Sequence, residues 1–380
     1  MPSSQDQGGP AGLTPFLLAW RTTPLRDREV VDALVHPAHA APSAALADAL
    51  AAWPGDYYWS DEAGGRWLVL TRRVRVAPER WWLHVALFVL TLVTTTIAGA
   101  VLQGRATVDD SWGLLRGRLA FSGDPGHALL SGLAFSIPLM AILLAHELGH
   151  YVTARRYLLD VSPPYFLPVP LWPSFIGTMG AFIRLRTLLS DRRQLFDVGV
   201  AGPLAGFALA LPTLLVGLHL SHPLPRAGGM SGMLLAVGSG PELLHLGDSF
   251  VTLLARWAVH GGLGPVLVHP LAFAGVLGMF VTMINLMPMA QLDGGHILYA
   301  ALPRWHRRAA LGFWIVVLLL GSWWSGWYIW AGLVLAVSRG RLDHPTVLEA
   351  SRPLPRSRRL LAWAALALFL LTFMPVPFHI

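Results

Sequence analysis

The residues best suited to chemistry are His146, Glu147 and His150, which form a His-Glu-x-x-His motif. On a helix the two histidines lie one turn apart on the same face, so both imidazoles can bind one Zn²⁺. Glu147 would then lie beside the metal as a general base. The pattern favours metal-assisted hydrolysis of a peptide bond, but a short motif also arises by chance or for structural reasons.

The motif ends a long uncharged segment, because residues 125–146 contain no Asp, Glu, Lys or Arg. Such a segment is long enough to cross the hydrocarbon core of a bilayer as a helix. An ionisable group at that depth costs roughly 3 kcal/mol or more on insertion scales and usually has a function. We therefore expect a membrane helix over residues 127–154, kinked at Pro138, with Glu147 close to one of its ends.

Composition supports a membrane protein, since 54% of the residues are hydrophobic and 13% are charged. Without any cysteine, a metal site must use nitrogen and oxygen ligands. All 28 basic residues are arginine, and the net charge of +7 indicates membrane topology and not nucleic-acid binding.

Two domains are predicted, a water-soluble domain over residues 1–80 and a membrane domain over 81–380. The first ten residues are polar and expected to be disordered, and no signal peptide is predicted, because no basic region followed by an apolar run and a cleavage site is seen. One or two short helices are expected between Asp27 and Trp53, with Ser43 as an N-cap, followed by a β-hairpin over residues 56–74. This small α+β domain would be a regulatory or docking module, or a mere tether.

Apolar segments predict about seven transmembrane helices. They are residues 81–104, 127–154, 197–220, 270–290, two crossings within 309–338, and 360–378. Residues 249–260 are expected to form an amphipathic helix on the far side of the membrane. With the N-terminus in the cytoplasm, most arginines fall on the inner side, as the positive-inside rule requires. The predicted fold class is an all-α polytopic membrane protein.

Residues 162–183 are apolar but contain five prolines, so they cannot form an ordinary helix. Irregular backbone at membrane depth is tolerated only where it is buried in protein or lines a cavity. We expect a re-entrant hairpin against the metal site, in which Gly177, Thr178 and Gly180 allow a substrate strand to approach. The alternative is a surface loop lying on lipid headgroups.

A second polar cluster, from Asn285 through Pro288 and Asp293 to His296, follows another apolar segment. Together with His146-Glu-Leu-Gly-His150 and Gly177-Thr-Met-Gly-Ala, it resembles the motifs of the site-2 protease family of intramembrane zinc metalloproteases. The sequence is most similar to a branch without a PDZ domain, which includes bacterial relatives of the chloroplast gravitropism-related homologues.

The resemblance implies that His146, His150 and Asp293 bind one Zn²⁺ per chain and that Glu147 is the catalytic base. Asp293 is also the only carboxylate between Arg256 and Arg304. His296 is expected to be a neighbour of the site and not a ligand. Asn285 would bind the substrate backbone or the developing oxyanion, or else make a structural contact.

The predicted function is an intramembrane zinc endopeptidase that cleaves transmembrane segments of other proteins in the lipid bilayer. The alternatives are a metal-ion transporter or metal-binding membrane protein, and a catalytically inactive scaffold. The expected location is a bacterial cytoplasmic membrane, which the chain crosses several times. The sequence does not predict the oligomeric state.

Overall fold

The computed structural model describes residues 10, 12–25, 27–39, 41, 43–62, 65–74, 78–108, 119–169, 176–187, 189, 191–225, 232–236, 243–342 and 353–379. The expected disorder of the first ten residues falls, apart from Pro10, outside this part of the chain. The chain divides into two compact units. One comprises residues 1–79, 154–162 and 185–190, and the other comprises 80–153, 163–184 and 191–380.

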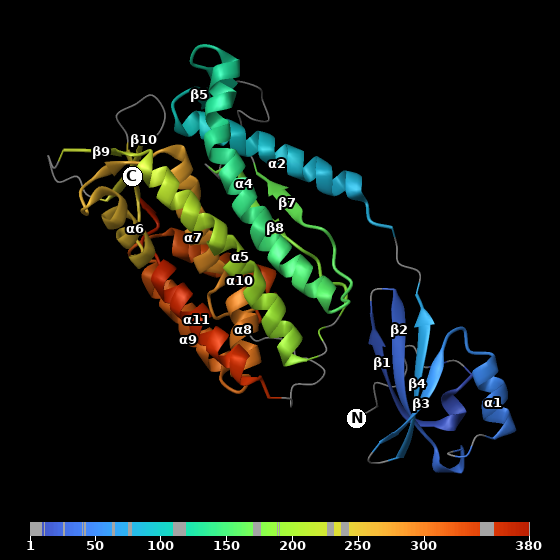
Figure 1. The fold of residues 1–380 in the computed structure, drawn as a ribbon. Coiled ribbons are helices and arrows are strands. Elements are labelled where there is room, and N and C mark those ends of the chain that lie inside the picture. Colours follow the sequence, from blue (N-terminus) through green and yellow to red (C-terminus); the bar gives the residue numbers. More distant parts are fainter. Residues whose placement is uncertain are drawn as a thin grey trace. The chain divides into compact units, whose positions relative to one another are not determined.

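The first unit is a four-stranded antiparallel sheet with one short α-helix (Figure 1). Its strands have the order β1-β2-β4-β3 and are β1 (Leu17–Pro24), β2 (Arg28–Val35), β3 (Tyr57–Glu62) and β4 (Gly65–Arg73). Two 3-10 helices, η1 (Thr14–Phe16) and η2 (Pro37–His39), flank the first hairpin. Helix α1 (Ala44–Ala51) places Leu46 and Leu50 in the same core as Leu68 and Leu70 of β4.

The N-terminal predictions are confirmed in part. Ser43 caps α1, because its hydroxyl accepts a hydrogen bond of 3.3 Å from the Leu46 backbone N–H. The predicted hairpin is β3 and β4. The expectation of helix from Asp27 onward is wrong for residues 28–35, which form β2. There Val31, Ala33 and Val35 are buried at every second position, which is the period of a strand.

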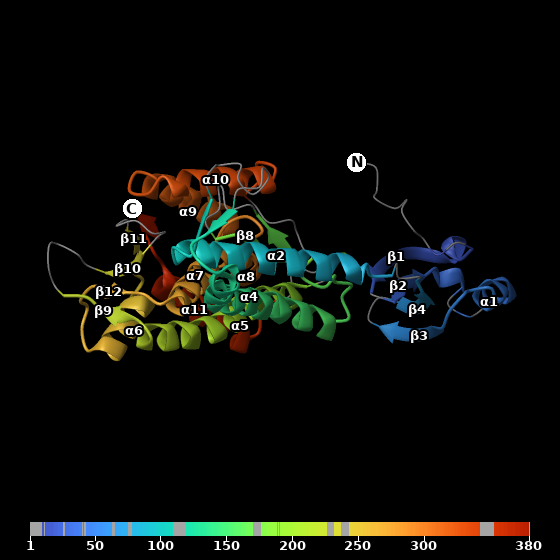
Figure 2. The same ribbon diagram turned by 90° about the horizontal axis from the view of Figure 1, so that it is seen from above.

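The second unit is mainly helical (Figure 2). Its longer helices are α2 (Trp81–Leu102), α4 (Pro125–Arg156), α5 (Arg192–His219), α7 (Pro270–Asn285) and α11 (Arg356–Thr372). Its shorter helices are α6 (Phe250–His260), α8 (Asp293–Ala301), α9 (His306–Leu320) and α10 (Gly326–Val337). Figure 2 shows α9 and α10 as a layer of their own beside the remaining helices of this unit.

Close helix contacts build the core of this unit. A Cβ atom added to Gly132 of α4 would lie 2.1 Å from the Thr96 carbonyl oxygen of α2. The Thr96 and Ser136 hydroxyls are hydrogen-bonded at 2.8 Å in the same contact. Small residues therefore let the polypeptide backbones approach, as is typical of helices packed in membranes.

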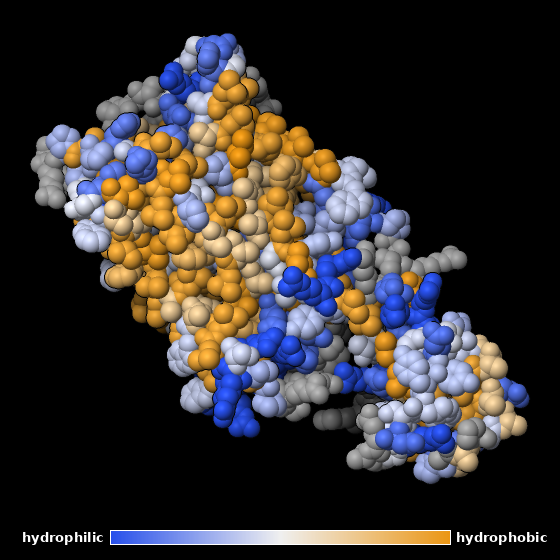
Figure 3. Space-filling model, in the orientation of Figure 1, coloured by the Kyte–Doolittle hydropathy of each residue, from blue (hydrophilic) through white to orange (hydrophobic). Residues whose placement is uncertain are grey.

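Three of the described helices, α2, α4 and α5, are long and apolar enough to cross a membrane. Figure 3 shows apolar residues over the middle of this unit on one face and hydrophilic residues at its two ends. Length and apolar composition therefore support three of the roughly seven predicted spans. Helices α7, α9, α10 and α11 have 16, 15, 12 and 17 residues, which at about 1.5 Å per residue is shorter than a hydrocarbon core of about 30 Å.

The predicted hairpin within residues 162–183 is present as β7 (Tyr165–Pro168) paired antiparallel with β8 (Thr178–Phe182).

The predicted all-α fold class for the membrane domain is too simple, because this unit also contains short strands. Strands β13 (Phe378–His379), β11 (Leu243–Leu246), β10 (Met233–Ala236), β12 (Val266–Leu267) and β9 (His222–Pro223) form a five-stranded sheet in this order. A further pair is β5 (Ala106–Val108) with β6 (Leu119–Phe121). Strands of two to four residues are too short for a period of two to be recognised in the sequence.

Helix α6 begins with a capping box between Ser249 and Thr252, so the expected helix over 249–260 is confirmed. An amphipathic helix is expected to expose its charged residues and bury its apolar ones, but α6 does the reverse. Arg256 is buried and pairs with Asp248 at 3.0 Å, whereas Phe250, Leu254 and Trp257 are exposed. An apolar outer face remains compatible with a position at a membrane interface.

Candidate metal centre

Helices α4 and α8 bring three ligand-type side chains together. The Nε2 atoms of His146 and His150 are 3.1 Å apart, and each lies 3.2 Å from Oδ2 of Asp293. His146 and His150 are one turn apart on α4, and Asp293 is the first residue of α8. Within the described part of the chain, these three form the only group of His, Asp or Glu side chains arranged to hold a metal ion.

The polarity of the three atoms fits a cation between them. Nδ1 of His150 lies 2.7 Å from the Val198 carbonyl oxygen and must donate its proton there, which leaves Nε2 as an acceptor. An acceptor that faces a carboxylate oxygen at 3.2 Å is repelled unless a cation or a proton lies between them. Tetrahedral Zn²⁺ with bonds of about 2.0–2.1 Å places its ligands about 3.3–3.4 Å apart, close to the observed separations.

Helix α5 makes room for the two imidazoles. A Cβ atom on Gly202 would lie 2.0 Å from Nε2 of His150, and one on Gly206 would lie 3.2 Å from Nδ1 of His146. Both glycines belong to the Ala201–Gly206 segment of α5, for which no contact with the histidine motif was predicted. The contact of Val198, Gly202 and Gly206 with the motif histidines was therefore missed, and glycines spaced four residues apart were its only signal.

Asp293 reaches the histidines because α7 ends at Asn285 and the chain turns through residues 286–292 before α8 begins. Gly294 permits this turn, since a Cβ atom there would lie 2.0 Å from the Leu286 carbonyl oxygen. His296 is one turn further along α8 and does not belong to the ligand group. His296 lies instead beside α5, because a Cβ atom added to Gly199 would be 3.0 Å from the Cβ of His296.

Glu147 lies next to this centre, in a largely apolar cavity of about 220 Å³. The Ile183 backbone N–H donates a hydrogen bond to the Glu147 carboxylate. Glu147 as a whole is only 6% exposed. The cavity is bounded by α4, α7, α10 and strand β8. A buried carboxylate that is not one of the grouped ligands is placed to act on whatever enters this cavity.

The other predicted site residues divide between the cavity and its support. Asn285, Thr178 and Gly180 line the cavity together with His146 and Glu147. Nδ2 of Asn285 is 3.4 Å from Nε2 of His146, a long hydrogen bond. Gly177 does not line the cavity, and its carbonyl oxygen accepts a hydrogen bond of 2.7 Å from the Thr94 hydroxyl of α2. This hydrogen bond joins the hairpin to α2.

A helical unit with apolar spans, and with two buried histidines beside a half-buried aspartate, defines a membrane protein that can bind a metal ion. Residues 134–320 match the profile of peptidase family M50. This segment, which contains all three motifs, therefore belongs to that family, which is the site-2 protease family that the motifs resemble.

Plant proteins are among its relatives. The chain is 37% identical over 172 residues to "Probable zinc metalloprotease EGY1, chloroplastic" of Oryza sativa subsp. japonica, which covers 45% of this chain and 28% of that protein. It is 30% identical over 270 residues to "Probable zinc metalloprotease EGY2, chloroplastic" of Arabidopsis thaliana, which covers 70% of this chain and 45% of that protein. The chain thus spans less than half the length of these relatives. No solved structure matches it significantly.

Proposed function

We propose that this protein is an intramembrane zinc endopeptidase that cleaves transmembrane segments of other membrane proteins. The observation that carries the proposal is the convergence of three metal-ligand atoms within 3.2 Å of one another, beside the buried Glu147 and an apolar cavity. Membership of peptidase family M50 supports the same reaction class.

In this proposal His146, His150 and Asp293 hold one Zn²⁺, which activates water and polarises the carbonyl of the scissile bond. Glu147 takes a proton from the attacking water and later gives it to the leaving amine. The hydrogen bond from the Ile183 N–H keeps its carboxylate in place. The apolar cavity walls limit the access of bulk water, which strengthens each electrostatic contact within the site.

Substrate binding is assigned to the hairpin and to Asn285. A helical substrate must unwind first, because its peptide groups are already paired and shielded. Thr178 and Gly180 of β8, which line the cavity, would contact the unwound strand, and Gly177 would hold the hairpin on α2. Asn285 would hydrogen-bond the substrate backbone from the opposite wall.

The arginine distribution supports a cytoplasmic N-terminus and about seven crossings, in which the shorter helices also cross. Residues 1–80 would then form a cytoplasmic regulatory or docking domain and residues 81–380 the protease domain. A bacterial cytoplasmic membrane stays a prediction, as does the branch without a PDZ domain.

The test is cleavage of a single-span model substrate by the purified chain in lipid vesicles, with the products identified by mass spectrometry. We expect cleavage within the span, loss of activity on removal of zinc with a chelator, and recovery on addition of zinc. A transporter would instead move zinc across the vesicle membrane without cutting the substrate, and an inactive scaffold would do neither.

A further inference from the structure

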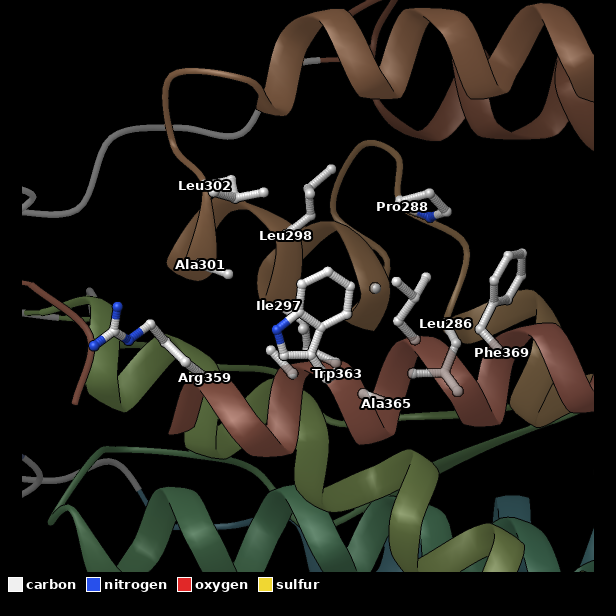
Figure 4. A pocket seen from close by; sticks show the side chains of 13 residues that line it. Leu286, Pro288, Ile297, Leu298, Ala301, Leu302, Arg359, Trp363, Ala365 and Phe369 are labelled. Carbon is white, nitrogen blue, oxygen red and sulfur yellow. The ribbon is translucent and has the colours of Figure 1, made fainter. Parts of the chain in front are cut away.

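A second cavity of about 320 Å³ lies between α8 and α11, away from the cavity that contains Glu147. We call it the α8–α11 groove. Its principal lining residues are Gly294, Ile297, Leu298, Arg359, Trp363 and Phe369. Figure 4 shows Arg359 at one end of the groove, Phe369 at the other and Trp363 between them. Every lining side chain except Arg359 is apolar or a glycine.

The dimensions of the groove fit one extended hydrocarbon chain. From Arg359 to Phe369 the helix advances ten residues, or about 15 Å, which is half of a hydrocarbon core of about 30 Å and therefore one leaflet. A volume of about 320 Å³ over this length gives a mean cross-section of about 20 Å². A helix about 10–12 Å across has a cross-section of roughly 80–110 Å², so a substrate helix or a helix of a second copy would cover the groove without entering it.

The charge at the end of the groove indicates an anionic headgroup. Arg359 lies in the first turn of α11, where the helix dipole also favours negative charge. Its neighbour Arg358 is already paired with Asp197 at 3.1 Å, whereas Arg359 has no ion pair with any residue that the structure describes. Trp363, 69% exposed, lies one turn further along, where an indole ring suits the boundary between headgroups and acyl chains.

The inner wall of the groove touches the loop that carries Asp293. Leu286 and Pro288, which follow the end of α7, and Gly294, directly after Asp293, all line it. From this contact, the apolar lining and the charge, we propose that the α8–α11 groove binds one acyl chain of an anionic phospholipid with its phosphate at Arg359. The bound chain packs against residues 286–292 and limits displacement of Asp293 from the two histidines.

Native mass spectrometry of the purified chain with phosphatidylglycerol or phosphatidylcholine tests the binding site. We expect a preference of about fivefold for phosphatidylglycerol, since one arginine near an anionic lipid contributes about a factor of five. Arg359→Gln should remove this preference, whereas Arg356→Gln, one turn earlier and outside the groove, should keep it. Equal binding of both lipids by the unmodified chain, or identical behaviour of the two arginine variants, would overturn the proposal.

A second pair of variants tests the acyl-chain position. Ala362→Phe fills the groove and should weaken binding of both lipids, whereas Ala364→Phe, exposed on α11 outside the groove, should bind like the unmodified chain. Equal lipid binding by these two variants contradicts the assignment. Displacement of the lipid by a peptide copy of a substrate span, with unchanged binding in Arg359→Gln, shows that the groove takes substrate instead.

The link to Asp293 rests on the proposed zinc site and needs its own measurement. Zinc release to a chelator should be severalfold slower in bilayers containing phosphatidylglycerol than in phosphatidylcholine alone, and Ala362→Phe should abolish this difference. Equal release rates would refute the coupling. A chain that binds phosphatidylglycerol as expected but holds no zinc would refute the proposed function and leave the lipid site standing.

Discussion

At the scale of single residues, Glu147 differs from its neighbours because it lies beside the ligand atoms without belonging to their group. Glu147→Gln keeps the size of the side chain and removes its ability to accept a proton. We expect cleavage to fall by at least a hundredfold, as is typical for loss of a general base, with about one zinc per chain retained. Metal analysis and a cleavage assay on the same sample decide this, and an active variant would refute the role of Glu147.

The third ligand is tested by two substitutions on one helix. Asp293→Asn should lose zinc and activity together, because its Oδ2 lies 3.2 Å from both imidazole Nε2 atoms. His296→Ala should keep the metal, because His296 is outside the ligand group. Zinc retained in Asp293→Asn and lost in His296→Ala would reverse the assignment.

Gly202 offers a test that the sequence motif alone does not suggest. Gly202→Ala would place a methyl group 2.0 Å from Nε2 of His150, so the imidazole must move. We expect the affinity for zinc to fall about 10- to 100-fold, as for other neighbours of metal ligands. Gly312→Ala is the matched control, since it lies in helix α9 with open space around it. Equal zinc affinity in the two variants would show that α5 can shift away from His150 without weakening zinc binding.

The proximity of His146 and His150 could be predicted from the sequence, because a His-x-x-x-His spacing on a helix already places the two side chains on one face. The partner of each histidine could not be predicted. The acceptor for Nδ1 of His150 is the backbone carbonyl oxygen of Val198. Every residue type has such an oxygen, so the sequence does not reveal this contact. The contact follows from how α4 crosses α5, which is a property of the packed helices.

At the scale of elements, the hairpin of β7 and β8 depends on two glycines with left-handed backbone, Gly177 with φ +81° and Gly180 with φ +99°. Gly177→Ala adds a clash to this strain, with a Cβ atom 2.5 Å from the Thr94 carbonyl oxygen, whereas Gly180→Ala meets nothing within 4 Å. We expect Gly177→Ala to lower the Tm and the cleavage rate more than Gly180→Ala. Equal effects would show that the contact with α2 does not hold the hairpin.

The N-terminal unit shows where element prediction fails. Residues 57–73 were recognised because two aromatic and β-branched runs flank a glycine pair, but residues 28–35 contain Arg, Glu, Asp and Ala, which also suit a helix. Their strand conformation is set by pairing with both β1 and β4. Tertiary pairing overrides local propensity at this position.

At the scale of the whole molecule, uncharged runs located α2, α4 and α5, because each is long enough to span a bilayer without help. They could not decide whether α7, α9, α10 and α11 cross the membrane, because each of these helices has 17 residues or fewer. Residues 309–338 form two helices, α9 and α10, around a turn at Gly321–Ser325. Their crossing of the membrane stays a prediction.

The absence of cysteine from the chain makes this last prediction directly testable. Ser122→Cys, Ser322→Cys and Ser357→Cys each place one thiol at an exposed position, before α4, between α9 and α10, and in the first turn of α11. With a cytoplasmic N-terminus and two crossings by α9 and α10, an impermeant maleimide added outside intact cells should label Ser122→Cys and Ser322→Cys but not Ser357→Cys. All three should react after the membrane is permeabilised. If Ser322→Cys reacts only then, while Ser122→Cys reacts from outside, α9 and α10 form a hairpin that does not cross. The arginines at residues 304–308 and 339–341 would then remain on one side without the intervening crossings.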